Sequence, residues 1–198
     1  MSYRDMLTTL YNRNRYIQVL EGMQAKTVIK TGVAYIDING LKRVNDLYGH
    51  EAGDRLIINT ARSMLAILPE NAYRVGGDEF VLICFDMDEK IFRSKVRDIC
   101  DSIAAKRISV SVGVVWEESS SELETMLRRA DDLMYAEKRN IMKSMERCEG
   151  MQQSVRGGQK KILTMLCPVF YTGHFVCAKR NTGIKIIGRN FEKFSVTF

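Results

Sequence analysis

The chain is organised around one heptapeptide, Arg74-Val75-Gly76-Gly77-Asp78-Glu79-Phe80. Its two glycines separate a short apolar run that begins at Ala72 from a longer one that ends at Phe85. Apolar runs on either side of a Gly-Gly pair predict a β-hairpin. The carboxylates of Asp78 and Glu79 therefore stand at the hairpin tip, where glycine lets another group approach the backbone closely. Adjacent carboxylates repel each other unless a cation is near, and a hard ion such as Mg²⁺ prefers oxygen ligands.

Length and composition indicate a protein with one good core and room for an appendage. The chain has 198 residues, of which 45% are apolar and 27% charged, as in ordinary globular proteins. No apolar run reaches the about 20 residues that a membrane helix needs. The first residues, Met1 to Asp5, lack a signal-peptide pattern, so we expect a cytoplasmic location. The five scattered cysteines are typical of free thiols in a reducing compartment.

The positive charge is confined to the end of the chain. Residues 1–150 carry 22 Lys and Arg against 23 Asp and Glu, a net charge of −1. Residues 151–198 carry 8 Lys and Arg and one acid, a net charge of +7. The basic pI is therefore no reason to expect nucleic-acid binding by the main domain. We predict a domain over 1–150 and a basic C-terminal extension over 151–198, joined by a linker at 152–159.

The hydrophobic pattern predicts nine elements. Helices are expected at about 12–24, 42–48, 51–68, 88–106 and 121–143. Strands are expected at about 26–38, 72–75, 80–85 and 108–114. The order α-β-α-α-β-β-α-β-α contains both a hairpin and helical crossovers. It predicts an α/β fold with a mixed central sheet flanked by helices.

Three carboxylates fall at strand ends. Asp37 closes the predicted strand 26–38, while Asp78 and Glu79 open the strand after the glycines. If these strands are neighbours, the three carboxylates meet at one edge of the sheet. Palm domains that transfer nucleotidyl groups hold divalent metals in this way.

The residues after Asp37 have the chemistry to bind a nucleotide. Asn39–Lys42 is a tight loop before a helix, and its N–H groups and the helix N-terminus can cradle phosphates. Asn45 and Asp54 then supply an amide and a carboxylate. Such a pair can hydrogen-bond a guanine edge, because a carboxylate accepts from N1–H and N2–H₂, which adenine does not match.

Five motifs occur in order along the chain. They are Asp5-x-Leu7-Thr8-x-Leu10-x-Asn12-Arg13, Asp37-Ile38-Asn39-Gly40-Leu41-Lys42-x-x-Asn45-Asp46-x-x-Gly49-His50-x-x-Gly53-Asp54, Gly76-Gly77-Asp78-Glu79-Phe80, Ser109-Val110-Ser111-Val112-Gly113 and Ala130-Asp131-x-x-Met134-Tyr135. In these motifs, residues 4–143 resemble the GGDEF family, the diguanylate cyclases. The resemblance implies an α/β palm like that of adenylyl cyclases. It also implies an enzyme that joins two GTP molecules into cyclic di-GMP and releases pyrophosphate.

The resemblance also assigns the reacting centre. It implies that Asp37, Asp78 and the backbone carbonyl of Ile38 bind Mg²⁺ or Mn²⁺. It further implies that Asp78 or Glu79 helps to deprotonate the attacking 3′-hydroxyl. Each domain would bind one GTP, so the reaction requires a homodimer in which two copies face each other.

The family's substrate contacts fall on six positions. Asn45 and Asp54 would bind guanine, the backbone of Gly40 and Leu41 together with Lys42 would hold the β- and γ-phosphates, and Lys138 would be the phosphate-binding lysine of the last helix.

The chain departs from the family pattern at two places. Met142 stands where members usually carry an arginine one helical turn after the lysine, so one phosphate contact is expected to be lost. The product-inhibition motif Arg-x-x-Asp would occupy positions 67–70, which read Ile-Leu-Pro-Glu, so feedback inhibition there is not expected. Beside the cyclase, two alternatives stay open: a catalytically weak or inactive GTP-binding regulatory module, and a scaffold that acts through the basic extension.

Overall fold

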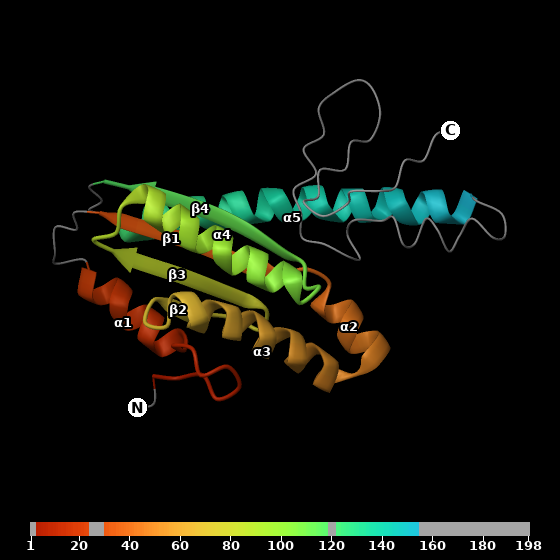
Figure 1. Ribbon diagram of the computed structural model, residues 1–198, viewed down its shortest axis with the longest axis horizontal. Helices are drawn as coiled ribbons and strands as arrows, with labels where there is room; N and C mark the ends of the chain where they lie inside the picture. Colours follow the sequence, from red (N-terminus) through yellow and green to blue (C-terminus); the bar gives the residue numbers. More distant parts are fainter. Residues whose placement is uncertain (1–2, 24–29, 119–121, 155–198) are drawn as a thin grey trace, which may run out of the picture.

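The computed structural model describes residues 3–23, 30–118 and 122–154 (Figure 1). In chain order the elements are α1 (Arg13–Met23), β1 (Thr31–Ile38), α2 (Leu41–Tyr48), α3 (His50–Ile67), β2 (Ala72–Arg74), β3 (Glu79–Phe85), α4 (Glu89–Ala105), β4 (Val110–Glu117) and α5 (Leu123–Ser154). The type and order of all nine elements agree with the sequence prediction.

The four strands form a sheet in the order β2-β3-β1-β4, and each neighbouring pair is antiparallel. The prediction of a mixed sheet is therefore wrong for these strands. The helical crossovers do connect strands that run in the same direction, β1 to β2 and β3 to β4. Each crossover skips one position, so an antiparallel strand fills the gap, as in a split βαβ arrangement. In the described part of the chain, parallel pairing is limited to an isolated bridge between Tyr11 and Tyr73.

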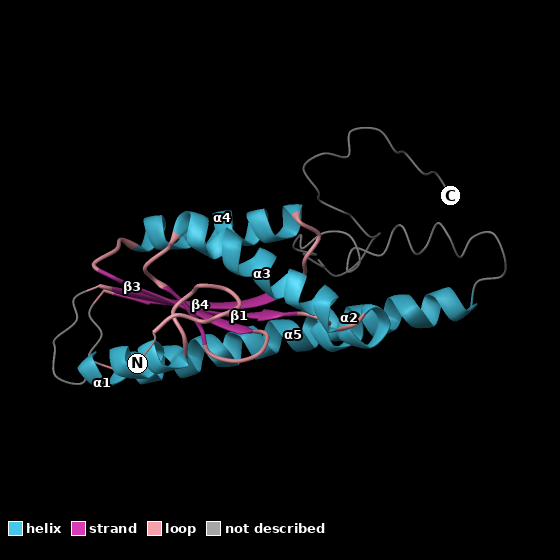
Figure 2. Cartoon of the chain, turned by 90° about the horizontal axis from the view of Figure 1, so that it is seen from below, coloured by secondary structure: helices cyan, strands magenta, loops and turns pink. Residues whose placement is uncertain are grey.

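Helices cover both faces of the sheet. Figure 2 shows α3 and α4 on one side of the strands and α1 and α5 on the other. Alternate residues of β1 point to opposite faces, so Ala34 and Ile36 join the core beneath α3 and α4, whereas Val33 joins the core beneath α5. The same alternation directs Asp37 toward α5. The carboxylate of Asp37 on β1 thus faces α5, the helix that carries Lys138.

Helix α5 lies directly on the edge strand β4. A Cβ atom at Gly113 would lie 2.5 Å from the backbone nitrogen of Met134 and 2.9 Å from the carbonyl carbon of Ala130. Only glycine permits so close an approach of helix and strand backbones. Glu137 adds a tie at the same edge, because its carboxylate accepts a hydrogen bond from the backbone N–H of Val112. The position of α5 relative to the sheet is therefore tightly defined.

Helix α5 is also longer than the sequence predicts. It continues to Ser154 rather than ending near residue 143, so residues 152–154, which we expected to begin a linker, are helical. Residues 143–154 contain no proline, and eight of the twelve are Lys, Met, Glu, Arg or Gln, which are good helix formers. The rest of the predicted basic extension, 155–198, lies outside the described residues.

Two further sequence expectations concern membranes and thiols. Within the described ranges, no helix has the length and apolar character needed to cross a bilayer. Cys84 and Cys100 are free thiols, as predicted, and burial raises the pKa of each to about 12. Both thiols are therefore protonated at neutral pH.

Candidate functional site

The strands that carry the three carboxylates are neighbours at the centre of the sheet. Asp37 on β1 lies opposite Glu79 on β3, and the backbone N–H of Ile38 donates to the carbonyl oxygen of Asp78 at 3.1 Å. The antiparallel register thus brings together Asp37, Asp78 and Glu79, which we call the carboxylate edge. Residues about 40 positions apart meet there because β1 and β3 pair in this register.

The hairpin tip is wider than a two-residue turn. Strand β2 ends at Arg74 and β3 begins at Glu79, and the N–H of Val75 donates to the Glu79 carbonyl at 3.0 Å. A Cβ atom at Gly76 would lie 3.2 Å from both Cβ and Cδ of Glu79 and would overlap its carboxylate. The close approach that the glycine permits is therefore that of the Glu79 side chain.

Asp37 and Lys138 form an ion pair between β1 and α5. The Lys138 ammonium lies 2.8 Å from both carboxylate oxygens and donates a hydrogen bond to Oδ2. Oδ1 is buried and accepts no hydrogen bond from the described residues. The side chain of Asp37 is 4% exposed and that of Lys138 is 29% exposed. The pair is therefore largely shielded from solvent.

The pKa of Asp37 is raised in spite of its ion pair with Lys138. Burial raises the pKa of Asp37 above its ordinary value, and the charges of Asp78 and Glu79 raise this pKa further. The hydrogen bond and charge of Lys138 oppose this effect without overcoming it. Lys138 pairs with Asp37, and the charges of Asp78 and Glu79 act on the same carboxylate, so this edge favours additional positive charge.

The donors of the carboxylate edge fit a hard divalent ion that receives further ligands from its substrate. Within the described residues, no group of three or more Asp, Glu, His or Cys side chains is arranged to hold a metal ion by itself. Mg²⁺ does not require one, since it commonly takes one or two carboxylates and completes its shell with phosphates and water. Oδ1 of Asp37 is buried and accepts no hydrogen bond from the described residues, although the Lys138 ammonium lies 2.8 Å from it, and Ile38 and Asp78 lie beside it. The fit of a hard divalent ion to this edge depends on the oxygen donors of Asp37, Ile38 and Asp78.

The predicted phosphate loop begins directly after the carboxylate edge. Gly40 has φ 74°, in the left-handed region that glycine tolerates, and α2 starts at Leu41 without a side-chain cap. Leu41 is buried and Lys42 is exposed, so the leucine anchors the first turn while the lysine faces solvent. The uncapped N–H groups of this turn are available to an anion.

A hydrogen-bonded anchor that the sequence did not reveal holds this loop. The side chain of Asn39 donates to Ser109 Oγ at 3.0 Å and accepts from Ser111 Oγ at 2.8 Å, while its backbone N–H donates to the Ser109 carbonyl at 2.9 Å. The alternating serines of an otherwise apolar strand were the available signal. They indicated a polar face, but not that the partner lies 70 residues away.

The two predicted guanine contacts come together where α2 packs on α3. A Cβ atom at Gly53 would lie 2.9 Å from Cγ of Asn45, so the Asn45 amide rests against the backbone of α3. Its Oδ1 is buried and has no hydrogen-bond partner among the described residues. Asp54 follows Gly53 directly and is exposed. The buried acceptor of Asn45 therefore packs on Gly53, whose neighbour in the chain is the exposed Asp54.

Arg74 is a second residue that sequence reasoning missed. Its guanidinium pairs with Asp5 at 3.0 Å and donates to the carbonyl oxygen of Gly77 at 2.9 Å. Asp5 also accepts a hydrogen bond from the Thr8 N–H at 2.9 Å. Burial acts to raise the pKa of Asp5, but the hydrogen bonds from Thr8 and Arg74 lower it overall. Arg74 thus ties the hairpin tip to the N-terminal motif.

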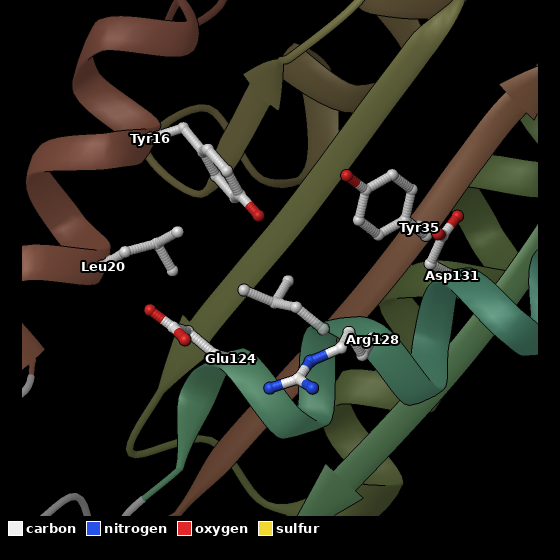
Figure 3. A pocket seen from close by; sticks show the side chains of 7 residues that line it. Tyr16, Leu20, Tyr35, Glu124, Arg128 and Asp131 are labelled. Carbon is white, nitrogen blue, oxygen red and sulfur yellow. The ribbon is translucent and has the colours of Figure 1, made fainter.

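A pocket of about 250 Å³ lies between α1, β1 and α5 (Figure 3). Tyr16, Tyr35, Arg128 and Asp131 are among its lining residues. Burial raises the pKa of both tyrosines. Tyr35 precedes Asp37 by two residues on β1, so the pocket borders the candidate site on the same face of the sheet. None of the predicted site residues lines it.

The antiparallel split βαβ sheet, with acids from two central strands at one edge, is the palm-like architecture of nucleotidyl cyclases. The family model described as "Diguanylate cyclase, GGDEF domain" matches residues 2–144. The chain belongs to this family.

Individual relatives are similar at modest identity. Diguanylate cyclase DgcM of Escherichia coli is 30% identical over 148 residues, which cover 69% of this chain and 36% of DgcM. Cyclic di-GMP phosphodiesterase PdeR of Escherichia coli is 30% identical over 146 residues, which cover 68% of this chain and 22% of PdeR. The chain therefore spans well under half the length of these curated relatives.

A solved structure with the same fold contains the coiled coil and GGDEF domain of DgcB from Caulobacter crescentus in complex with c-di-GMP. It aligns with a TM-score of 0.62 and 25% identity, covering 70% of this chain and 81% of that one. Together the relatives support diguanylate cyclase chemistry. The similarity to a phosphodiesterase means that family membership alone does not define the reaction.

Proposed function

We propose that this domain is a metal-dependent diguanylate cyclase that condenses two GTP molecules into cyclic di-GMP as a homodimer. The observation that carries the proposal is the β1–β3 register, which sets Asp37 opposite Glu79 and beside Asp78. The similarity to diguanylate cyclases such as DgcM supports it. Because the proposed substrate is GTP, we expect the domain to act in the cytoplasm.

The reaction consists of two equivalent displacements. The 3′-hydroxyl oxygen of one GTP forms a bond to the α-phosphorus of the other, and the bond from that phosphorus to the bridging oxygen of the β-phosphate breaks. Pyrophosphate leaves with the bonding electrons, and Asp78 or Glu79 accepts the hydroxyl proton. Repetition with the two roles exchanged closes the ring and releases a second pyrophosphate.

Asp37, Asp78 and the carbonyl of Ile38 would hold Mg²⁺ or Mn²⁺. When bound, the ion stabilises negative charge that develops on the reacting phosphate. The chain's own contribution is to position the substrate. The N-terminal turn of α2 at Gly40 and Leu41 binds the terminal phosphates through its N–H groups.

Lys42 adds positive charge beside these phosphates. Asn45 and Asp54 bind the guanine edge, and the buried Oδ1 of Asn45 gains the hydrogen bond that it lacks within the described chain. Adenine offers no N1–H or N2–H₂ donors to Asp54. The pair therefore selects GTP over ATP.

Each domain offers one set of these contacts, whereas the reaction needs two GTP molecules with their 3′-hydroxyls facing each other's α-phosphates. The site is therefore incomplete without a second copy of the domain. The rate per chain is expected to rise with protein concentration until the dimer is saturated.

The alternative is a regulatory module that binds GTP without turning it over. Met142 is 50% exposed on α5, one helical turn after Lys138, so it offers no charge to a phosphate there. This observation favours weaker binding of the leaving group than in relatives that carry arginine.

Incubation of the purified chain with GTP and Mg²⁺, followed by chromatography of the products, tests the proposal. The wild type should form cyclic di-GMP, and Asp78→Ala should abolish its formation. Asp98→Ala is the matched control, because it removes an exposed carboxylate from α4. Calorimetric GTP binding without product at any protein concentration would establish the regulatory module instead.

A further inference from the structure

Lys138 lies where a metal ion and a carboxylate are expected to meet. Its ammonium is 2.8 Å from both oxygens of Asp37, although its expected partner is a phosphate. With only 4% of its side chain exposed, Asp37 has little open surface left for a second cation. Lys138, which is expected to bind a substrate phosphate, thus contacts the carboxylate of Asp37, which is expected to bind the metal ion.

The structure fixes the backbone of Lys138 but leaves its ammonium group free to reorient. Helix α5 is held against β4 by the close contact at Gly113 and by the hydrogen bond from Val112 to Glu137. The backbone of Lys138 therefore has a defined position above the sheet. Its four-carbon side chain is flexible and 29% exposed, so the ammonium can reorient toward solvent while the helix stays in place.

A divalent ion and the ammonium cannot both hold Asp37 at these distances without strong repulsion. Mg²⁺ binds carboxylate oxygens at about 2.1 Å, closer than the ammonium does. Like charges so close together in a shielded site repel far more than they would in water. Entry of the ion is therefore opposed as long as Lys138 remains on Asp37.

We propose that Lys138 competes with the divalent ion for Asp37 and thereby couples metal binding to nucleotide binding, an inference that rests on the metal site of the proposed function. Without nucleotide, the ammonium holds the carboxylate and the affinity for metal is low. Nucleotide phosphates at the start of α2 give Lys138 another anion, and Asp37 becomes available to the ion. By linkage, the metal strengthens nucleotide binding by the same factor.

The direct test measures Mn²⁺ binding to the full chain without nucleotide, using the electron paramagnetic resonance signal of free Mn²⁺. Lys138→Met should bind Mn²⁺ about tenfold more tightly than the wild type, within the usual range of coupling between sites. Arg139→Met is the matched control, because it removes a charge from the adjacent exposed position. It should change the Mn²⁺ affinity by less than about twofold.

Two additions complete this experiment. A non-hydrolysable GTP analogue should raise the Mn²⁺ affinity of the wild type but much less that of Lys138→Met. Asp37→Asn in the Lys138→Met background should remove the tight site. The inference is overturned if Lys138→Met binds Mn²⁺ no more tightly than the wild type, or if Arg139→Met tightens binding equally.

A measurement on the wild type avoids any folding defect of the variants. Mass spectrometry after brief labelling with an amine-specific reagent reports the exposure of each lysine. Mg²⁺ should increase labelling of Lys138 but not of Lys42, and unchanged labelling of Lys138 would contradict the inference. If the wild type makes cyclic di-GMP while these tests fail, the competition is wrong and the cyclase stands. If product formation fails as well, the proposed function also falls.

Discussion

The contact at Gly113 gives a quantitative prediction about how α5 positions Lys138. The substitution Gly113→Ala places a methyl group 2.5 Å from the Met134 nitrogen and 2.9 Å from the carbonyl carbon of Ala130. Ordinary contacts require at least 3.4 Å, so α5 must retreat by at least roughly 1 Å. The obstacle is helix backbone, which cannot rotate away as a side chain can. The helix must therefore shift as a body, and Lys138 with it.

The expected effect on stability follows from overpacking. Forcing a methyl group into a closely packed interface costs typically 1–3 kcal/mol, and the backbone contact places Gly113→Ala near the upper end, at about 3 kcal/mol. For a chain of this size the melting temperature should fall by about 6–12 °C. Thermal unfolding followed by circular dichroism measures the change.

The control is Gly22→Ala, since a Cβ atom at Gly22 in α1 meets nothing within 4 Å. This variant should be unchanged or slightly more stable, because alanine favours the helix. Gly113→Ala should also weaken GTP binding through the displaced Lys138. A Gly113→Ala protein within about 0.5 kcal/mol of the wild type would refute the packing argument.

Three further substitutions test separate parts of the site. Arg74→Met should lower the free energy of unfolding by about 2 kcal/mol in urea denaturation, because it removes a charge-assisted hydrogen bond to Gly77 and a half-buried ion pair. The exposed Arg93→Met should cost less than about 0.5 kcal/mol, and an equal loss in both would argue against the anchor. Burial raises the pKa of Glu137 in the folded protein. The buried carboxylate therefore lowers the free energy of unfolding as the pH rises from the unfolded-state pKa to the folded-state pKa. Glu137→Gln should therefore be more stable than the wild type at about pH 7 and equal to it at about pH 3.5, where both states are protonated; urea denaturation at both pH values decides. Asp54→Asn should weaken GTP binding about tenfold to a hundredfold by calorimetry, with weak ATP binding unchanged; an unaltered GTP affinity would remove Asp54 from the guanine site.

Local patterns were sufficient to predict the elements. Apolar periodicity located the strand that carries Asp37 and the hairpin around Gly76 and Gly77, because side-chain spacing and turn chemistry act over a few residues. Element ends were less accurate, as α5 shows by continuing to Ser154. Good helix formers extended the helix past the point where its apolar stripe became hard to follow.

Strand order could not be read in the same way. The crossovers were expected to make neighbours of parallel strands, but each skips a position and β1 pairs with β3 and β4 instead. The sequence of a crossover helix does not specify whether the two strands that it connects become neighbours. Strand order depends on how the helices on both faces of the sheet and the hairpin pack together. The mixed sheet was wrong for this reason.

The sequence by itself determined which residues carry the chemistry: Asp37 at a strand end, the two acids after the glycines, and the nucleotide-binding positions that the family motifs identify. Only the tertiary structure decided which of them touch. It placed Lys138 on Asp37, Arg74 on Asp5, and Asn39 on Ser109 and Ser111. Residue type is set locally, whereas contacts between residues 69 to 101 positions apart exist only once strands and helices have packed, so no local pattern records them.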